Sequence, residues 1–131
     1  MEEKEPAWAL DELRRSLQAP ALPADVQRSL FPSLVCVADE LALDFDDWRR
    51  IATARHKFTT DRLSALASVD ALLSQTSGRK NAELWTDAAL ADHPCWQDVR
   101  ERARQTLRAF GWKVEMPPKN RATYIRGGNP E

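Results

Sequence analysis

Residues 34–56, LVCVADELALDFDDWRRIATARH, form the stretch that decides the fold. Apolar side chains recur there every three or four positions, which is the repeat of an α-helix with one buried face. We therefore predict a long helix over 34–56 that forms the spine of the core. One alternative stays open at its start, because the run 34–37 with its two valines is also typical of a strand. The members of the apolar stripe are Leu34, Val37, Ala38, Leu41, Phe45, Trp48 and Ala52.

Shorter helices are predicted on both sides of this stretch. Prolines mark the ends of the segments that precede it, since proline lacks an amide donor and restricts the residue before it. Downstream, Thr86 is a candidate N-cap, Pro94 suits a first helical turn, and Gly78 and Gly111 stand where helices end. The same apolar repeat places these helices over 7–19, 24–31, about 59–76, 87–91 and 94–110.

The helical repeat stops at Gly111. Residues 112–116 and 121–126 alternate apolar and polar side chains around Pro-Pro-Lys-Asn at 117–120, which predicts a two-stranded β-hairpin. The expected fold class is mainly α, with five to six helices and a C-terminal β-hairpin. We expect a single domain over 1–131, and any subdivision to separate a helical part, 1–78, from a second part, 82–126.

Composition excludes several classes of protein. With 131 residues, 43% hydrophobic and 30% charged, the chain has the apolar content of one folded domain and is not a disordered tail. It has no apolar run long enough to span a membrane, and its acidic start does not resemble a signal peptide. The two cysteines, Cys36 and Cys95, do not make a disulfide framework, so we expect a cytoplasmic location.

Positive charge is concentrated toward the C-terminus. Residues 1–93 carry 11 Lys/Arg and 16 Asp/Glu, a net charge of −5, whereas residues 94–131 carry 8 and 4, a net charge of +4. Arg100, Arg104 and Arg108 are spaced four apart, so they form one stripe along the predicted helix 94–110. Such a stripe is suited to contact phosphate groups, although arginine is also an ordinary helix former on a solvated face.

The order of elements over 82–126 resembles a winged helix-turn-helix module. A short extended piece at 82–85 precedes two helices joined by a tight turn, and the predicted hairpin follows as the wing. The stretch 99–112, VRERARQTLRAFGW, is similar to a recognition helix and wing entry, and 121–126 is similar to a returning wing strand. The resemblance implies that the second helix enters the major groove of duplex DNA while the wing contacts the backbone.

The resemblance and the charge pattern predict a nucleic-acid-binding accessory protein whose partner is double-stranded DNA. Asp98 and Glu101 oppose this interpretation, because their carboxylates repel phosphate near the place where bases would be contacted. The residues predicted to contact nucleic acid are Gln97, Arg100, Arg104, Arg108, Lys113, Lys119, Arg121 and Arg126.

An acidic cluster in the long helix supports a different hypothesis. Asp39, Glu40, Asp44, Asp46 and Asp47 crowd its first half, and arginines follow in its second half. This order complements the helix dipole and permits ion pairs within the helix. It also offers an acidic face to a basic protein partner, so the alternative function is that of a protein-binding adaptor, immunity or accessory protein. An exposed group among the five tryptophans would serve the same purpose.

No pattern in the sequence predicts catalysis or a bound cofactor. The chain has no phosphate-binding glycine loop, no Gly-x-Ser-x-Gly motif and no credible Cys-His pair. His56, His93 and the two cysteines match no zinc-ligand spacing. We therefore expect a non-enzymatic protein without a metal or cofactor, and the sequence leaves its oligomeric state open.

Overall fold

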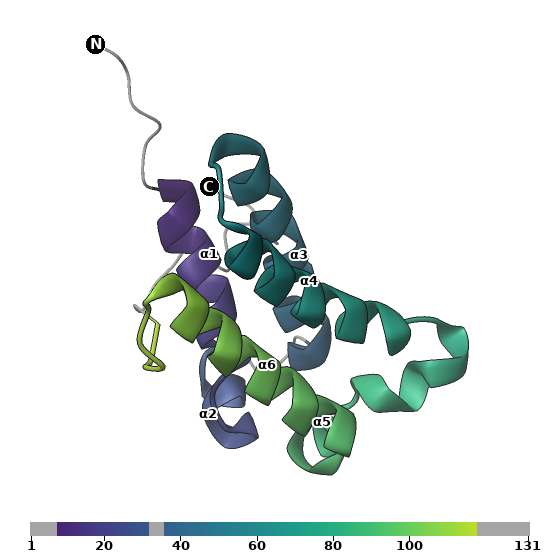
Figure 1. Cartoon of the computed structure of the whole chain (residues 1–131). Coiled ribbons are helices and arrows are strands. Elements are labelled where there is room, and N and C mark those ends of the chain that lie inside the picture. Colours follow the sequence, from purple (N-terminus) through teal and green to yellow (C-terminus); the bar gives the residue numbers. More distant parts are fainter. Residues whose placement is uncertain (1–7, 32–35, 118–131) are drawn as a thin grey trace, which may run out of the picture.

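The computed structural model describes residues 8–31 and 36–117, and these ranges consist of helices joined by short connections (Figure 1). Helices make up 77% of the described residues, so the expected helical character is confirmed. The elements in chain order are α1 (Trp8–Gln18), α2 (Ala24–Ser29), α3 (Val37–Arg55), α4 (Thr60–Gln75), the 3₁₀ segment η1 (Arg79–Trp85), α5 (Asp87–Asp92) and α6 (Pro94–Phe110).

The predicted C-terminal β-hairpin is wrong, because the described part of the chain contains no strand. After Gly111 the backbone turns back onto the end of α6: the Trp112 amide donates to the Leu107 carbonyl at 2.8 Å, and the Trp112 ring stacks on Phe110 at 4.5 Å. Of the apolar residues that suggested a strand, Trp112 thus packs against the helix end, whereas Val114 and Met116 are exposed. The second expected strand, 121–126, lies outside the described residues.

Residues 82–85 are not extended either, since they belong to η1. Two tryptophans hold this segment in place. The indole N–H of Trp85 donates to the Thr76 carbonyl at 2.7 Å, and that of Trp96 donates to the Leu84 carbonyl at 2.6 Å. Their rings meet edge to face at 5.2 Å. Packing of these two indoles, each with its N–H hydrogen-bonded, outweighs the preference of residues 82–85 for an extended backbone.

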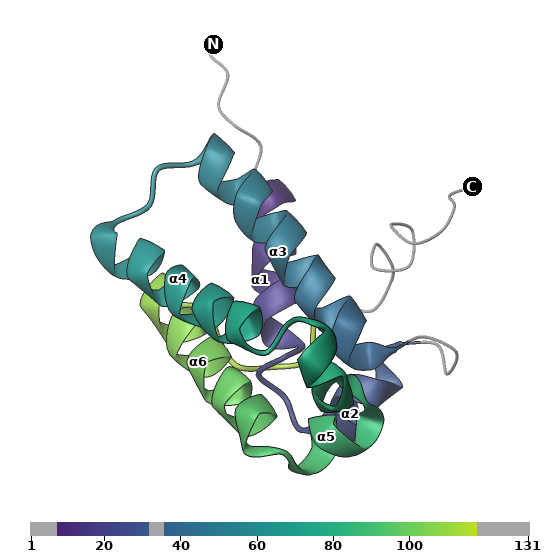
Figure 2. The same ribbon diagram turned by 90° about the vertical axis from the view of Figure 1, so that its right-hand side faces the viewer.

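Two antiparallel helix pairs form the body of the molecule (Figures 1 and 2). In one pair, Arg62 near the start of α4 donates to the carbonyl of Ala109 at the end of α6, and Thr106 donates to the carbonyl of Ala65. In the other pair, α1 packs along α3 and begins where α3 ends, since Arg55 lies over the Trp8 ring at 5.0 Å. The helix α1 also contacts α6, so the two pairs share one core.

Local sequence signals set several helix ends as predicted. Thr86 caps α5 by accepting from the Ala89 amide at 3.1 Å, and Pro94 occupies the first turn of α6. Gly111 adopts φ 77°, a left-handed conformation that glycine reaches without a Cβ penalty. The long helix α3 begins at Val37, because Cys36, which the sequence predicts to be helical, is its extended N-cap residue; the expected helical residues 34–35 lie outside the described ranges.

The core contains residues from every α-helix. Its largest fully buried apolar side chains include Phe45 of α3, Leu13 and Leu17 of α1, and Leu66 of α4. Phe45 and its stripe neighbours Leu41 and Ala52 are buried as predicted, whereas Trp48 is only partly buried. Among the helices of the described ranges, none has the length and apolar content that crossing a membrane requires.

Candidate functional site

The arginine stripe of α6 is not a row of equivalent exposed side chains. Arg104 is half-buried, and its Nε donates to the carbonyl of Ala21 at 2.9 Å. Arg100 is half-buried as well, and its Nε donates to the carbonyl of Leu22 at 3.0 Å. Arg108, one turn further on, is exposed and lies 3.7 Å from the Glu101 carboxylate.

Arg100 and Arg104 therefore hold the connection between α1 and α2. The side-chain amide of Gln27, which is fully buried, donates to one further carbonyl of that connection, that of Pro20, and also to the Leu22 carbonyl that Arg100 contacts. A connection rich in proline cannot satisfy its carbonyls through helical hydrogen bonds, so side chains from α2 and α6 do so. This structural role explains half-burial of the two arginines without any nucleic acid.

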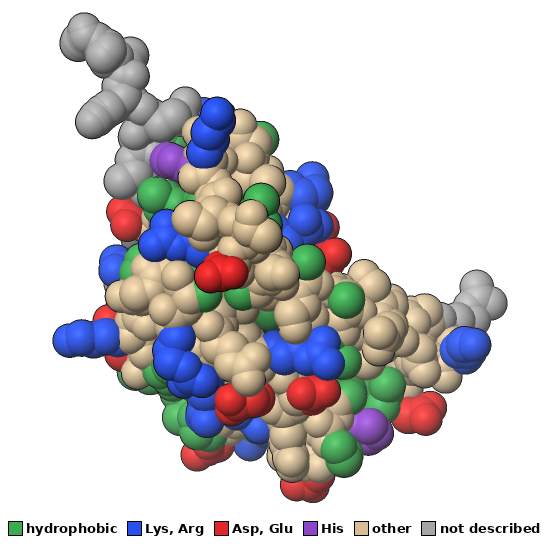
Figure 3. Space-filling view, viewed as in Figure 1, with side chains coloured by type: hydrophobic (Ala, Val, Ile, Leu, Met, Phe, Trp, Pro, Cys, Tyr) green, Lys and Arg blue, Asp and Glu red, His purple; other side chains and the backbone are tan. Residues whose placement is uncertain are grey.

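The other residues predicted to contact nucleic acid are scattered. Gln97 is exposed and donates to the Asp92 carbonyl at 3.5 Å, while Lys113 is exposed in the segment after α6. Lys119, Arg121 and Arg126 lie outside the described residues. Figure 3 shows Lys and Arg side chains interspersed with Asp and Glu over the face that includes α6, with no continuous basic area. DNA binding by this helix stays a prediction.

The acidic cluster of α3 is divided between the interior and the surface. Asp44 is buried and accepts two hydrogen bonds from the Arg15 guanidinium of α1, at 2.8 and 3.1 Å. Arg15 also donates to Glu12 at 2.7 Å. Burial alone would lower the pKa of Arg15, but its hydrogen bonds and ion pairs with Asp44 and Glu12 outweigh burial and raise it. Asp44 thus belongs to a buried ion pair and not to an acidic face.

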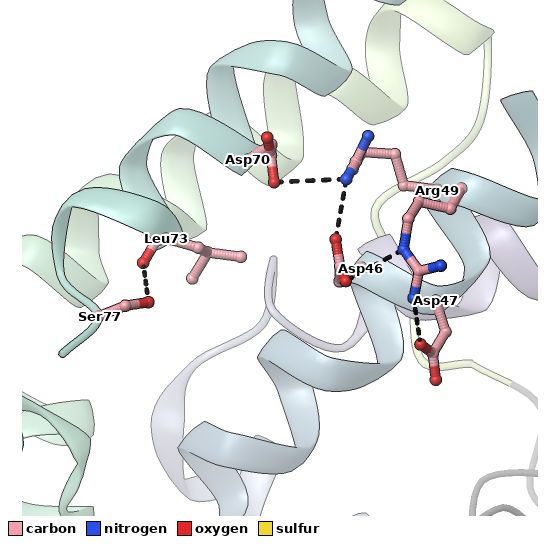
Figure 4. A network of polar contacts seen from close by, with 7 residues as sticks. Asp46, Asp47, Arg49, Asp70, Leu73 and Ser77 are labelled. Carbon is pink, nitrogen blue, oxygen red and sulfur yellow. Dashed lines mark hydrogen bonds and ion pairs between the residues drawn. The ribbon is translucent and has the colours of Figure 1, made fainter.

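Arginines of the same helix neutralise the next two carboxylates. Arg49 contacts Asp46 at 2.8 Å and reaches across to Asp70 of α4 at 3.6 Å (Figure 4). Arg50 contacts Asp46 at 3.3 Å and Asp47 at 3.0 Å. Burial would raise the pKa of Asp46, but the hydrogen bonds from Arg49 and Arg50 outweigh it and lower that pKa.

Asp39 and Glu40 are the members of the cluster that pair with no lysine or arginine in the described part of the chain. They lie in the first turn of α3, where the helix dipole favours negative charge. The described residues contain no group of three or more histidine, cysteine or carboxylate side chains that could hold a metal ion.

An open groove lies beside Asp39, between α3 and the C-terminal end of α4. Two adjoining hollows of about 340 and 270 Å³ form it, and both are lined by Ala42, Leu43, Ser77 and Trp85. Asp39 borders the first hollow, whereas Asp46 and Asp70 border the second. Leu43 is 55% exposed there, although it stands in the middle of α3.

The tryptophans do not gather into one exposed cluster. Trp8 meets Trp48 edge to face at 5.7 Å near the start of α1, and Trp112 stacks on Phe110 at the end of α6. Trp96 is buried, and its neighbour Trp85 is half-buried at the groove. Of the five residues, Trp85 is thus the one that lines the groove between α3 and α4.

Sequence reasoning missed this groove, although a signal was present. Leu43 lies off the apolar stripe that contains Leu41 and Phe45, so a strict helical repeat already places it away from the core. Fold and site together define a helical domain with an apolar, partly acidic groove. Comparisons of the chain with protein-family models, with curated proteins and with solved structures found no match.

Proposed function

We propose that this protein is a non-enzymatic protein-binding domain whose groove receives an apolar side chain and a neighbouring lysine or arginine of a partner protein. The observation that carries the proposal is the exposed Leu43 beside Trp85, with Asp39 at the border of the same hollow. A site of this kind resembles the centre of a protein interface, where an aromatic residue and an aliphatic residue are surrounded by polar groups.

The aromatic side chain in the apolar part of the groove is held in a fixed orientation. The Trp85 indole is fixed by its hydrogen bond to Thr76 and by its edge contact with Trp96. A rigid aromatic side chain loses little conformational freedom when a partner covers it. Covering an exposed leucine side chain stabilises a complex by roughly 1.5–3 kcal/mol. Together these two side chains supply an apolar centre.

The two ends of the groove differ in charge, which favours one orientation of a bound partner. At one end, Arg49 lies between Asp46 and Asp70, and together with Arg50 it offsets the charge of these two carboxylates. At the other end, Asp39 pairs with no lysine or arginine of the described residues. A partner that places its cation against Asp39 forms an ion pair, whereas the reverse orientation brings that cation toward Arg49. Charge placement of this type selects orientation and partner more than it adds affinity.

A cytoplasmic location is part of the proposal. It is supported by the free thiols of Cys36 and Cys95, since a reducing compartment keeps cysteines unpaired.

Site-specific photo-crosslinking tests the proposal in the cells that make the protein. A photoreactive phenylalanine analogue replaces Leu43 in one variant and Leu63 in a control variant. Leu63 is a matched control because it is 42% exposed on α4 and does not line either hollow of the groove. We expect a discrete protein adduct from position 43 only, with the cross-link next to a lysine or arginine of the partner. Equal adducts at both positions, or none at position 43, would refute the proposal.

A further inference from the structure

A separate hollow, of about 420 Å³, lies on another part of the surface, where the start of α2 meets α6 and the end of α5. Its lining includes two arginines from different helices, Arg28 of α2 and Arg100 of α6, together with Ala91 of α5. Neither arginine pairs with a carboxylate in the part of the chain that the structure describes. Two cations that form no ion pair with the described residues thus border one concave space, which Asp25 borders as well.

The orientation of Arg100 is fixed by the fold. Its Nε donates to the Leu22 carbonyl at 3.0 Å, and one turn along α6 the Nε of Arg104 donates to the Ala21 carbonyl at 2.9 Å. The two guanidinium groups are therefore held side by side. Burial lowers the pKa of Arg100, and the charge of Arg104 lowers it further. An anion placed in the hollow would relieve this repulsion between like charges.

We propose that this hollow binds a phosphate group, with Arg28 and Arg100 as its charged ligands. A guanidinium presents several N–H donors in one plane, and this geometry matches two oxygens of a phosphate group. The donors of two arginines are thus suited to one tetrahedral phosphate group. The bound group is either a free phosphate or a phosphate of a nucleic-acid backbone, because both present at least two unesterified oxygens to the guanidinium donors. The site does not depend on the protein-binding groove, which lies on α3, α4 and η1.

Asp25 is the one carboxylate in the lining of the hollow. It lies in the first turn of α2, where its charge suits the helix terminus. The same charge opposes a phosphate, so its removal is expected to strengthen binding. Asp25→Asn is therefore expected to bind phosphate more tightly, and a variant that merely loses structure would not do so.

The test is a titration of the isotope-labelled protein with inorganic phosphate at neutral pH, monitored by NMR. Sodium chloride keeps the ionic strength constant throughout the titration. We expect saturable shifts at Arg28, Arg100 and Ala91. Arg28→Gln should weaken binding by about tenfold, as expected for one lost hydrogen bond to a charged group. Asp25→Asn should strengthen it roughly threefold by removing a like charge. Arg108→Gln is the matched control, because Arg108 is an exposed arginine of α6 that does not line the hollow, and it should change nothing.

A second arm distinguishes the two sources of the phosphate group. Competition by a short duplex DNA for the same shifts would assign the site to a nucleic-acid backbone, and saturation by inorganic phosphate without competition would assign it to a free anion. Either result supports the site. Absence of saturable shifts, or equal affinities of the wild type and Arg28→Gln, would overturn it. Arg28 is the primary variant because it is exposed, whereas Arg100 also holds the Leu22 carbonyl.

Discussion

Replacing Asp44 by asparagine should destabilise the fold far more than the same change at the surface. The Asp44 side chain is 5% exposed and the Arg15 side chain 9% exposed, and two hydrogen bonds join them. Asparagine keeps the size of the side chain but leaves the buried guanidinium without its bidentate partner. Breaking a buried ion pair in this way costs about 3–5 kcal/mol. The Glu12 carboxylate, 2.7 Å from the Arg15 Nε, compensates part of that charge, so we expect about 3 kcal/mol.

Urea denaturation followed by far-UV circular dichroism measures this effect. Asp98→Asn is the matched control, because Asp98 forms a solvent-exposed pair with Arg102 at 3.6 Å on α6. Exposed pairs contribute about 0–1 kcal/mol, so the control should remain close to the wild type. The double change Arg15→Met with Asp44→Leu should recover most of the lost stability, since apolar side chains can replace a buried pair. Equal effects of Asp44→Asn and Asp98→Asn would refute the argument from burial.

Three further perturbations test other parts of the structure. Arg104→Met should lower the free energy of unfolding by about 1–3 kcal/mol, because the buried Ala21 carbonyl loses its donor. The control Arg108→Met should change the free energy of unfolding by less than about 0.5 kcal/mol, and urea denaturation measures both variants. Gly111→Ala should lower it by about 1 kcal/mol in a thermal melt, since alanine is strained at φ 77° and its Cβ would gain no contact within 4 Å. Asp46→Asn should reduce stability slightly at neutral pH, because the pKa of Asp46 is lowered in the folded protein. In melts at decreasing pH, the stability difference between variant and wild type should vanish once the pH falls below that pKa. A difference that persists at that pH would contradict the ion pairs assigned to Asp46.

The parts of the fold that the sequence predicts well are those with local causes. Thr86, Pro94 and Gly111 act within one helical turn, and the structure places α5 and α6 close to the predicted limits. The repeat of Leu41 and Phe45 likewise depends only on helix geometry and correctly predicts which face of α3 is buried. Such features need no information about distant segments.

The errors concern contacts between distant residues. The alternation after Gly111 suggested a strand, but a strand needs a partner, and Trp112 stacks on Phe110 instead. The stripe of arginines suggested phosphate contacts, yet the Nε of Arg104 donates to a carbonyl 83 positions earlier in the chain. No local pattern indicates that carbonyl. The sequence pattern places Asp44 with its acidic neighbours, although it is buried in an ion pair with Arg15 of another helix.

The most direct test of the account is the affinity of the groove for the protein that is cross-linked at position 43. Isothermal titration calorimetry with the purified partner would compare the wild type with Leu43→Ser and Leu63→Ser. Loss of roughly 1.5–3 kcal/mol of apolar contact corresponds to a complex about 10- to 150-fold weaker for Leu43→Ser. Leu63→Ser should bind as the wild type does, because Leu63 does not line the groove. Unchanged affinity of Leu43→Ser, with its melting temperature preserved, would contradict the assignment of this groove as the binding site.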